Sequence, residues 1–222
     1  AEDPLALHTE NGILYLTKCP IADMLSSSMD NVESIELIKL QTEWDAKLYI
    51  HNTTHCIAAY LGYMKKVKYV HDSMLIPENA FIVKSVINEL MSALKNTLRY
   101  ENSFLESYAE KELSRFTNTL MYDPITRVAR HPLRKLRPFP NGRLIGAVEL
   151  CLSHSVFPSH LLRGCAAAFL YDNPDDDDFE SIRLIPYYGL PEFMQHFLGV
   201  PVDSTLSNLL TDNYEALRSS SV

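Results

Sequence analysis

A lysine, an asparagine and a histidine stand close together in an otherwise apolar stretch, "KLYIHNTTHCIAAYLG", at residues 47–62. At about 100° per residue of an α-helix, Lys47, His55 and Asn52 lie at about 0°, 80° and 140°. The three side chains could therefore share one face of a helix over roughly two turns. We expect them to line one cleft, with Leu48 and Ile57 turned toward the helical core.

These three residue types suit the oxidation of an alcohol or the reduction of a ketone. Burial lowers the pKa of a lysine, which can then act as a general base near neutral pH. An amide and an imidazole beside it could hydrogen-bond a hydroxyl or carbonyl oxygen and stabilise its developing charge. The simpler interpretation is a long helix whose polar side chains merely face solvent.

The same stretch also offers two histidines at the spacing of metal ligands on a helix. His51 and His55 are an i, i+4 pair, but Asn52 stands where a zinc protease carries its glutamate. The sequence offers no evident third ligand. We therefore expect no metal at this site.

A second group of residues is strongly basic. Six positive charges and no acidic residue lie between residues 127 and 143, in a chain whose net charge is −8. They are Arg127, Arg130, Arg134, Lys135, Arg137 and Arg143. Arginine side chains suit phosphate and carboxylate oxygens, so the segment could bind an anionic substrate. The alternative is a set of surface salt bridges to the chain's own acidic helices.

An acidic run, "NPDDDDFE", follows at residues 173–180. It lacks the glycine and the spaced ligands of an EF-hand calcium loop. We interpret it as a solvated loop.

A mainly helical fold must position these groups. Apolar residues recur at helical spacing after Pro77, and helical patterns also cover about 101–117, 142–156, 158–171, 188–198 and 204–217. Asp30 and Glu33 have the spacing of a helix N-cap and its N3 partner, which predicts a helix from there to about Gly62. The segment 121–143, rich in proline and arginine, should be mostly loop.

The N-terminal part of the chain predicts a small β element. Asn11 and Gly12 separate two strand-like runs within residues 5–18, which is a strong signal for a β-hairpin turn. We expect residues 1–30 to form a hairpin and a connection, and residues 31–222 to form one helical domain.

Composition limits the class of protein further. The chain has 222 residues, 46% of them hydrophobic, and an acidic net charge that argues against nucleic acid as a partner. Its four cysteines form no C-x-x-C pair, and Cys56 and Cys165 lie in apolar runs. That pattern is typical of buried free thiols in a reducing cytosol, so we expect a cytoplasmic protein. No uncharged apolar run reaches 18 residues, so we expect no membrane span or membrane partner.

The stretch 47–62 resembles the signature of the polyol-specific long-chain dehydrogenases, Lys-x4-Asn-x2-His. Lys47, Asn52 and His55 match it residue for residue. "RFTNTLMYDPITRVARHPLRKL" (115–136), followed by "GRLIG" (142–146), resembles that family's downstream substrate-site segment. Within the family, the chain is most similar to the branch that acts on mannitol 1-phosphate. Thr54 departs from the pattern, which usually has glycine there.

The resemblance implies a multi-helical fold similar to the C-terminal domain of 6-phosphogluconate dehydrogenase. It implies a reversible, metal-independent oxidation of mannitol 1-phosphate to fructose 6-phosphate. Lys47 would be the general base, while Asn52 and His55 would hydrogen-bond the reacting oxygen. The substrate-binding positions that the resemblance implies are Arg127, Lys135, Arg130 and Arg134.

The resemblance also implies NAD as the cofactor. No G-x-G-x-x-G occurs among the seven glycines of this chain, so we expect its nucleotide-binding domain to be absent from these 222 residues. The chain would then be the substrate domain of a longer protein, inactive alone, with that domain and a polyol phosphate as its partners. Two other interpretations stay open: a related module that binds a sugar phosphate or a protein without catalysis, and an unrelated helical interaction module.

Overall fold

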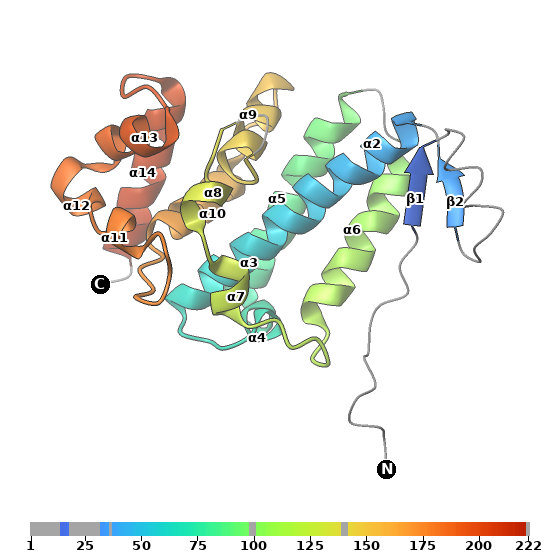
Figure 1. Cartoon of the computed structure of the whole chain (residues 1–222), viewed down its shortest axis with the longest axis horizontal. Helices are drawn as coiled ribbons and strands as arrows, with labels where there is room; N and C mark the ends of the chain where they lie inside the picture. Colours follow the sequence, from blue (N-terminus) through green and yellow to red (C-terminus); the bar gives the residue numbers. More distant parts are fainter. Residues whose placement is uncertain (1–13, 18–31, 36, 98–100, 139–141, 221–222) are drawn as a thin grey trace, which may run out of the picture. The chain divides into compact units, whose positions relative to one another are not determined.

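The computed structural model describes residues 14–17, 32–35, 37–97, 101–138 and 142–220, with side chains from residue 42 onward (Figure 1). The chain divides into two compact units, Ala1–Asp45 and Ala46–Val222, and each is described by itself. Among the described residues, no helix combines the length and the apolar character that a membrane crossing requires.

The first unit contains a short parallel strand pair. β1 (Leu14–Thr17) pairs with β2 (Val32–Ile35), and α2 (Leu37–Ala46) follows. The predicted helix start at Asp30 and Glu33 is therefore wrong, because residues 32–35 are a strand that begins and ends with β-branched residues. The turn of the expected hairpin and its first arm lie outside the described residues.

The described elements of the second unit are helices joined by loops, which confirms the mainly α fold. Its elements, in chain order, are η1 (Lys47–Thr53), α3 (Thr54–Met64), α4 (Val70–Leu75), α5 (Pro77–Lys95), α6 (Asn102–Thr117), α7 (Ile125–Ala129), α8 (Pro132–Lys135), α9 (Ile145–Ser153), α10 (Ser159–Phe169), α11 (Phe179–Ile182), α12 (Ile185–Tyr188), α13 (Leu190–Leu198) and α14 (Thr205–Ser219). The predicted helices near 77–98, 101–117, 142–156, 158–171, 188–198 and 204–217 are all present. The basic segment 121–143 contains two short helices, α7 and α8, joined by loop.

Helices α3, α5 and α10 pack against one another at the centre of this unit. Helix α14 packs on α10, α4 and α7 pack on α3, and α6 contacts both α5 and η1, so that α6 and α14 lie toward opposite ends (Figure 1). Gly164 of α10 lets α3 approach closely, because a Cβ added there would lie 2.7 Å from side-chain atoms of Ile57. Ile57 is fully buried, as predicted.

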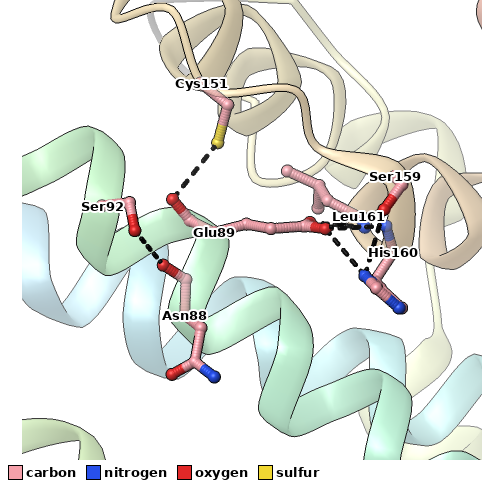
Figure 2. Close-up of polar contacts among 7 residues, drawn as sticks. All are labelled: Asn88, Glu89, Ser92, Cys151, Ser159, His160 and Leu161. Atoms are coloured by element: carbon pink, nitrogen blue, oxygen red, sulfur yellow. Dashed lines mark hydrogen bonds and ion pairs between the residues drawn. The ribbon is translucent and has the colours of Figure 1, made fainter.

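A glutamate from α5 caps the N-terminus of α10 (Figure 2). Glu89 accepts hydrogen bonds from the backbone N–H groups of His160 (2.9 Å) and Leu161 (3.0 Å). Its carboxylate also lies 2.9 Å from His160 Nδ1 and accepts from Ser159 Oγ at 3.2 Å. The first N–H groups of a helix lack partners within the helix, and a negative charge is favourable there. Glu89 therefore ties two central helices together.

Three cysteines in the described part of the chain are buried free thiols: Cys56, Cys151 and Cys165. This confirms the prediction for Cys56 and Cys165. Burial raises the pKa of the Cys56 thiol to about 11 and that of Cys151 to about 12, and it raises the pKa of Cys165 well above its usual value. All three stay protonated near neutral pH and are poor nucleophiles.

Candidate active site

The predicted catalytic residues begin on a π-helix rather than an α-helix. η1 covers Lys47–Thr53, and α3 continues the same stretch from Thr54. In a π-helix the hydrogen bonds run from i to i+5, so each residue turns less about the axis than in an α-helix. The angles calculated above for an α-helix are therefore wrong between Lys47 and Thr53. Single π-helical turns occur frequently at functional sites.

Two buried threonines stabilise this wide turn. Thr53 Oγ1 lies 2.6 Å from the carbonyl oxygen of Arg143 and 3.1 Å from that of Leu48. Its single hydroxyl hydrogen favours the nearer acceptor, which joins η1 to the end of the basic segment. Thr54 Oγ1 donates to the Ile50 carbonyl. Thr54 is completely buried, so the departure from the family's glycine faces the interior.

The three predicted catalytic side chains differ in burial. Lys47 is exposed, Asn52 is half-buried, and only 14% of the His55 side chain is exposed. The described residues therefore do not bury Lys47 as we expected. Leu48 packs partly buried against the core, as expected for its side of the helix.

His55 is held in a pocket of aromatic and charged groups. Its ring stacks on Phe116, with centroids 5.1 Å apart and planes 10° from parallel. Burial, together with the nearby charges of His51, Arg115 and Arg127, lowers the pKa of His55 to about 3, although Glu112 acts in the opposite direction. The imidazole is therefore neutral at neutral pH and can hydrogen-bond an oxygen without carrying a charge.

Asp123 links the predicted catalytic residues to the predicted basic segment. Its Oδ2 lies 3.2 Å from His55 Nε2, at ion-pair distance but without the alignment of a hydrogen bond, and its Oδ1 pairs with the guanidinium of Arg127. One carboxylate thus lies between the signature histidine and the first arginine of the basic segment. Sequence reasoning missed Asp123, although its i, i+4 spacing to Arg127 was a usable signal.

Lys135 is buried, with 3% of the residue exposed. Its ammonium donates to the carbonyl of Arg130 and lies 5.9 Å from the centre of the Tyr60 ring. Burial lowers the pKa of Lys135 to about 8. The side chain of Lys135 therefore points into the interior of the helical unit. Arg130 and Arg134 are exposed and form no ion pair with any described residue.

The acidic run 173–180 is loop as far as Asp178, as expected, but it also anchors the basic segment. Asp176 accepts a 3.0 Å hydrogen bond from the backbone N–H of His131, and Asp178 accepts one of 2.9 Å from that of Leu133. His131 has a positive φ of 56°, a strained conformation for a residue other than glycine. The carboxylates thus hold the backbone and leave the exposed arginine side chains available.

Among the described residues, one group of side chains at this contact between the acidic run and the basic segment could surround a cation. Ligand atoms of His131, Asp176 and Asp178 lie within 4.8 Å of one another. Both carboxylates already accept backbone hydrogen bonds, which explains the cluster without a metal.

A cavity of about 660 Å³ lies at the other end of α3, away from the signature. Its lining is largely apolar and includes Tyr63, Val67, Ile125 and Leu170. None of the seven predicted site residues lines it. The geometry around His55 and Asp123 is therefore the better guide to chemistry.

Comparisons with known proteins agree with the resemblance to the polyol-specific dehydrogenases. A family model described as the mannitol dehydrogenase C-terminal domain matches residues 42–186. A mannitol-1-phosphate 5-dehydrogenase of Caldanaerobacter subterraneus subsp. tengcongensis is 31% identical over 189 residues, 84% of this chain and 48% of that protein. One from Thermoanaerobacter pseudethanolicus is 32% identical over 192 residues, 85% and 48% respectively. This chain thus spans about half the length of the curated relatives that it matches.

Proposed function

This chain belongs to the family of mannitol dehydrogenase C-terminal domains, and from that premise we propose that it binds and deprotonates a polyol phosphate in an NAD-dependent dehydrogenase. The observation that carries the proposal is the position of Asp123 between His55 and Arg127. Two sequence blocks that suit different tasks, acid–base chemistry and anion binding, meet at that carboxylate.

In this proposal the residues of the chain perform the proton half of the oxidation. The amine of Lys47, exposed on η1 among the described residues, accepts the proton of the substrate hydroxyl once the nucleotide-binding domain of the complete protein covers it. Asn52 and the neutral ring of His55 hydrogen-bond the same oxygen as its negative charge develops. The reverse reaction returns the proton from Lys47 to the ketone oxygen.

We assign the phosphate to the basic segment. Arg127 has 57% of its side chain exposed, and Arg130 and Arg134 are exposed as well, so their guanidinium groups can meet an anion. Lys135 supports them from inside through its bond to the Arg130 carbonyl. The substrate would be mannitol 1-phosphate and the product fructose 6-phosphate, in accord with the names of the relatives.

The residues of this chain do not fit NAD. The chain has no G-x-G-x-x-G, and its described strands are two segments of four residues. We therefore place the hydride acceptor on a nucleotide-binding domain outside these residues, which accords with relatives about twice as long. The proposal puts the complete protein in the cytoplasm.

Replacing the general base tests the proposal. In the protein that carries the nucleotide-binding domain, Lys47→Ala should lower kcat for mannitol 1-phosphate oxidation by about 10²- to 10⁴-fold. The matched control is Lys84→Ala, an exposed lysine of α5, which should leave kcat unchanged. Undiminished turnover by Lys47→Ala, or steady-state dehydrogenase activity from the 222 residues alone, would contradict the proposal.

A further inference from the structure

Two buried groups beside the signature take no part in the proposed chemistry. His51 of η1 is 9% exposed, Glu112 of α6 is 3% exposed, and His51 Nδ1 lies 2.5 Å from Glu112 Oε2. A carboxylate is costly to bury unless a charged or hydrogen-bonded partner compensates it. The ring N–H of His51 provides that partner, so α6 and η1 are joined by a buried polar bond.

The next turn of α6 makes a second contact with the same region. Phe116 lies four residues after Glu112 and stacks on His55, which lies four residues after His51. The rings of His51 and His55 are themselves 5.2 Å apart. One face of α6 therefore contacts both histidines: Glu112 binds His51, and Phe116 stacks on His55 while its centroid also lies 5.6 Å from that of the His51 ring.

We propose that Glu112 and Phe116 are positioning residues: Glu112 fixes His51 and the π-helical turn, and Phe116 fixes the ring of His55. The inference rests on the proposed function in one respect, namely that His55 hydrogen-bonds the reacting oxygen. Neither positioning residue touches the substrate. Their effect reaches the oxygen only through the orientation of η1 and of the His55 ring.

The electrostatics of the pair support a persistent contact. Burial alone would raise the pKa of Glu112, but the hydrogen bond and charge of His51 lower it on balance. Glu112 is therefore ionised near neutral pH and remains an acceptor for His51. This buried bond restrains the π-helical turn, because it fixes His51 of η1 to Glu112 of α6.

Three variants and a control separate positioning from general stability. Glu112→Leu removes the acceptor, while Glu112→Gln keeps the shape and an oxygen that can accept from His51. The matched control is Glu110→Gln, an exposed carboxylate on the same helix. Phe116→Leu removes the stacked ring while keeping an apolar side chain, and serves independently should Glu112→Leu fail to fold.

The first readout is the imidazole NMR spectrum of the 222-residue chain, which needs no cofactor. Glu112→Leu and Phe116→Leu should both shift the ring resonances of His55, whereas Glu112→Gln should shift them much less and Glu110→Gln not at all. His55 resonances that stay unchanged in both Glu112→Leu and Phe116→Leu would overturn the inference, even if both variants were less stable.

The second readout is kinetic, in the protein with its nucleotide-binding domain. Glu112→Leu should lower kcat by about 10- to 100-fold, the range found for partners that orient a metal-bound histidine, with a smaller change in KM. Glu112→Gln should recover most of that loss. If kcat instead stays normal in Glu112→Leu while His55→Ala is impaired, the positioning role falls and the proposed function stands. If His55→Ala and Lys47→Ala both turn over normally, the proposed function falls, and the NMR result still decides whether α6 holds His55.

Discussion

The carboxylate of Asp123 lies between His55 and Arg127, and each of its oxygens faces one of them. Burial lowers the pKa of His55, and the positive charge of Arg127 acts in the same direction. The ion pair with Asp123 restrains Arg127 by its i, i+4 spacing while 57% of its side chain stays exposed. Asp123 thus holds the arginine in a fixed orientation, while burial keeps His55 neutral.

Replacing that arginine should separate the phosphorylated substrate from the plain polyol. In the protein with its nucleotide-binding domain, Arg127→Ala should lower kcat/KM for mannitol 1-phosphate far more than for mannitol. A hydrogen bond to a charged group contributes about 1.5 to 3 kcal/mol, which corresponds to roughly ten- to more than a hundredfold. Arg183→Ala, an exposed arginine paired with Glu180, is the control. Equal losses for both substrates would mean that Arg127 braces the segment or binds sugar hydroxyls.

The choice of buried lysine could not be read from the sequence. Lys47 stands among apolar residues yet is exposed, whereas Lys135, in a run of charges, is buried with a pKa lowered to about 8. Local apolar neighbours do not decide this. Burial of Lys135 depends on the Tyr60 ring and the Arg130 carbonyl, which only the folded arrangement supplies.

At the scale of elements, the helices whose apolar residues recur at helical spacing over several turns were predictable. α5 and α10 lie close to their expected ranges because each presents buried residues at helical spacing. The π-helix was not predictable, because its hydrogen-bond pattern depends on Thr53 and Thr54 together with the distant Arg143 carbonyl. The strand at 32–35 was not predictable from Asp30 and Glu33, because a capping pattern by itself does not determine that a helix follows.

The cap formed by Glu89 gives a test at the same scale. Glu89→Ala leaves the first N–H groups of α10 without a partner, and its side chain is only 12% exposed, so water replaces it poorly. The free energy of unfolding should fall by about 1–3 kcal/mol, measured by urea denaturation of the 222-residue chain. Glu106→Gln, which removes an exposed ion pair with Lys95, should cost no more than about 1 kcal/mol. Equal, small losses for both variants would show that the cap contributes little.

For the whole molecule, the lowered pKa of His55 predicts how stability depends on pH. The unfolded chain binds a proton at His55 below about pH 6.5, whereas the folded chain does so only near pH 3. The stability linked to His55 is therefore complete above pH 6.5 and is lost as the pH falls toward 3. In the middle of this window the slope is about 1.4 kcal/mol per pH unit for one proton.

His55→Gln removes that titrating group. Its free energy of unfolding is measured by urea denaturation between pH 4 and pH 6. The slope of this free energy against pH should be smaller than in the original chain, by the amount that corresponds to the uptake of about one proton on unfolding. His196→Gln, at an exposed histidine, should keep the original slope. An unchanged slope in His55→Gln would show that His55 takes up its proton in the folded chain near its ordinary pKa.

The three buried thiols have a consequence for how this molecule responds to chemical attack. Cys56 and Cys165 are on the closely packed helices α3 and α10, and Cys151 lies on α9, which contacts both α5 and α10. A disulfide reagent dissolved in the surrounding water cannot reach these sulfur atoms without separating the central helices. The rate at which these thiols are modified therefore reports how often the helical unit opens on a large scale.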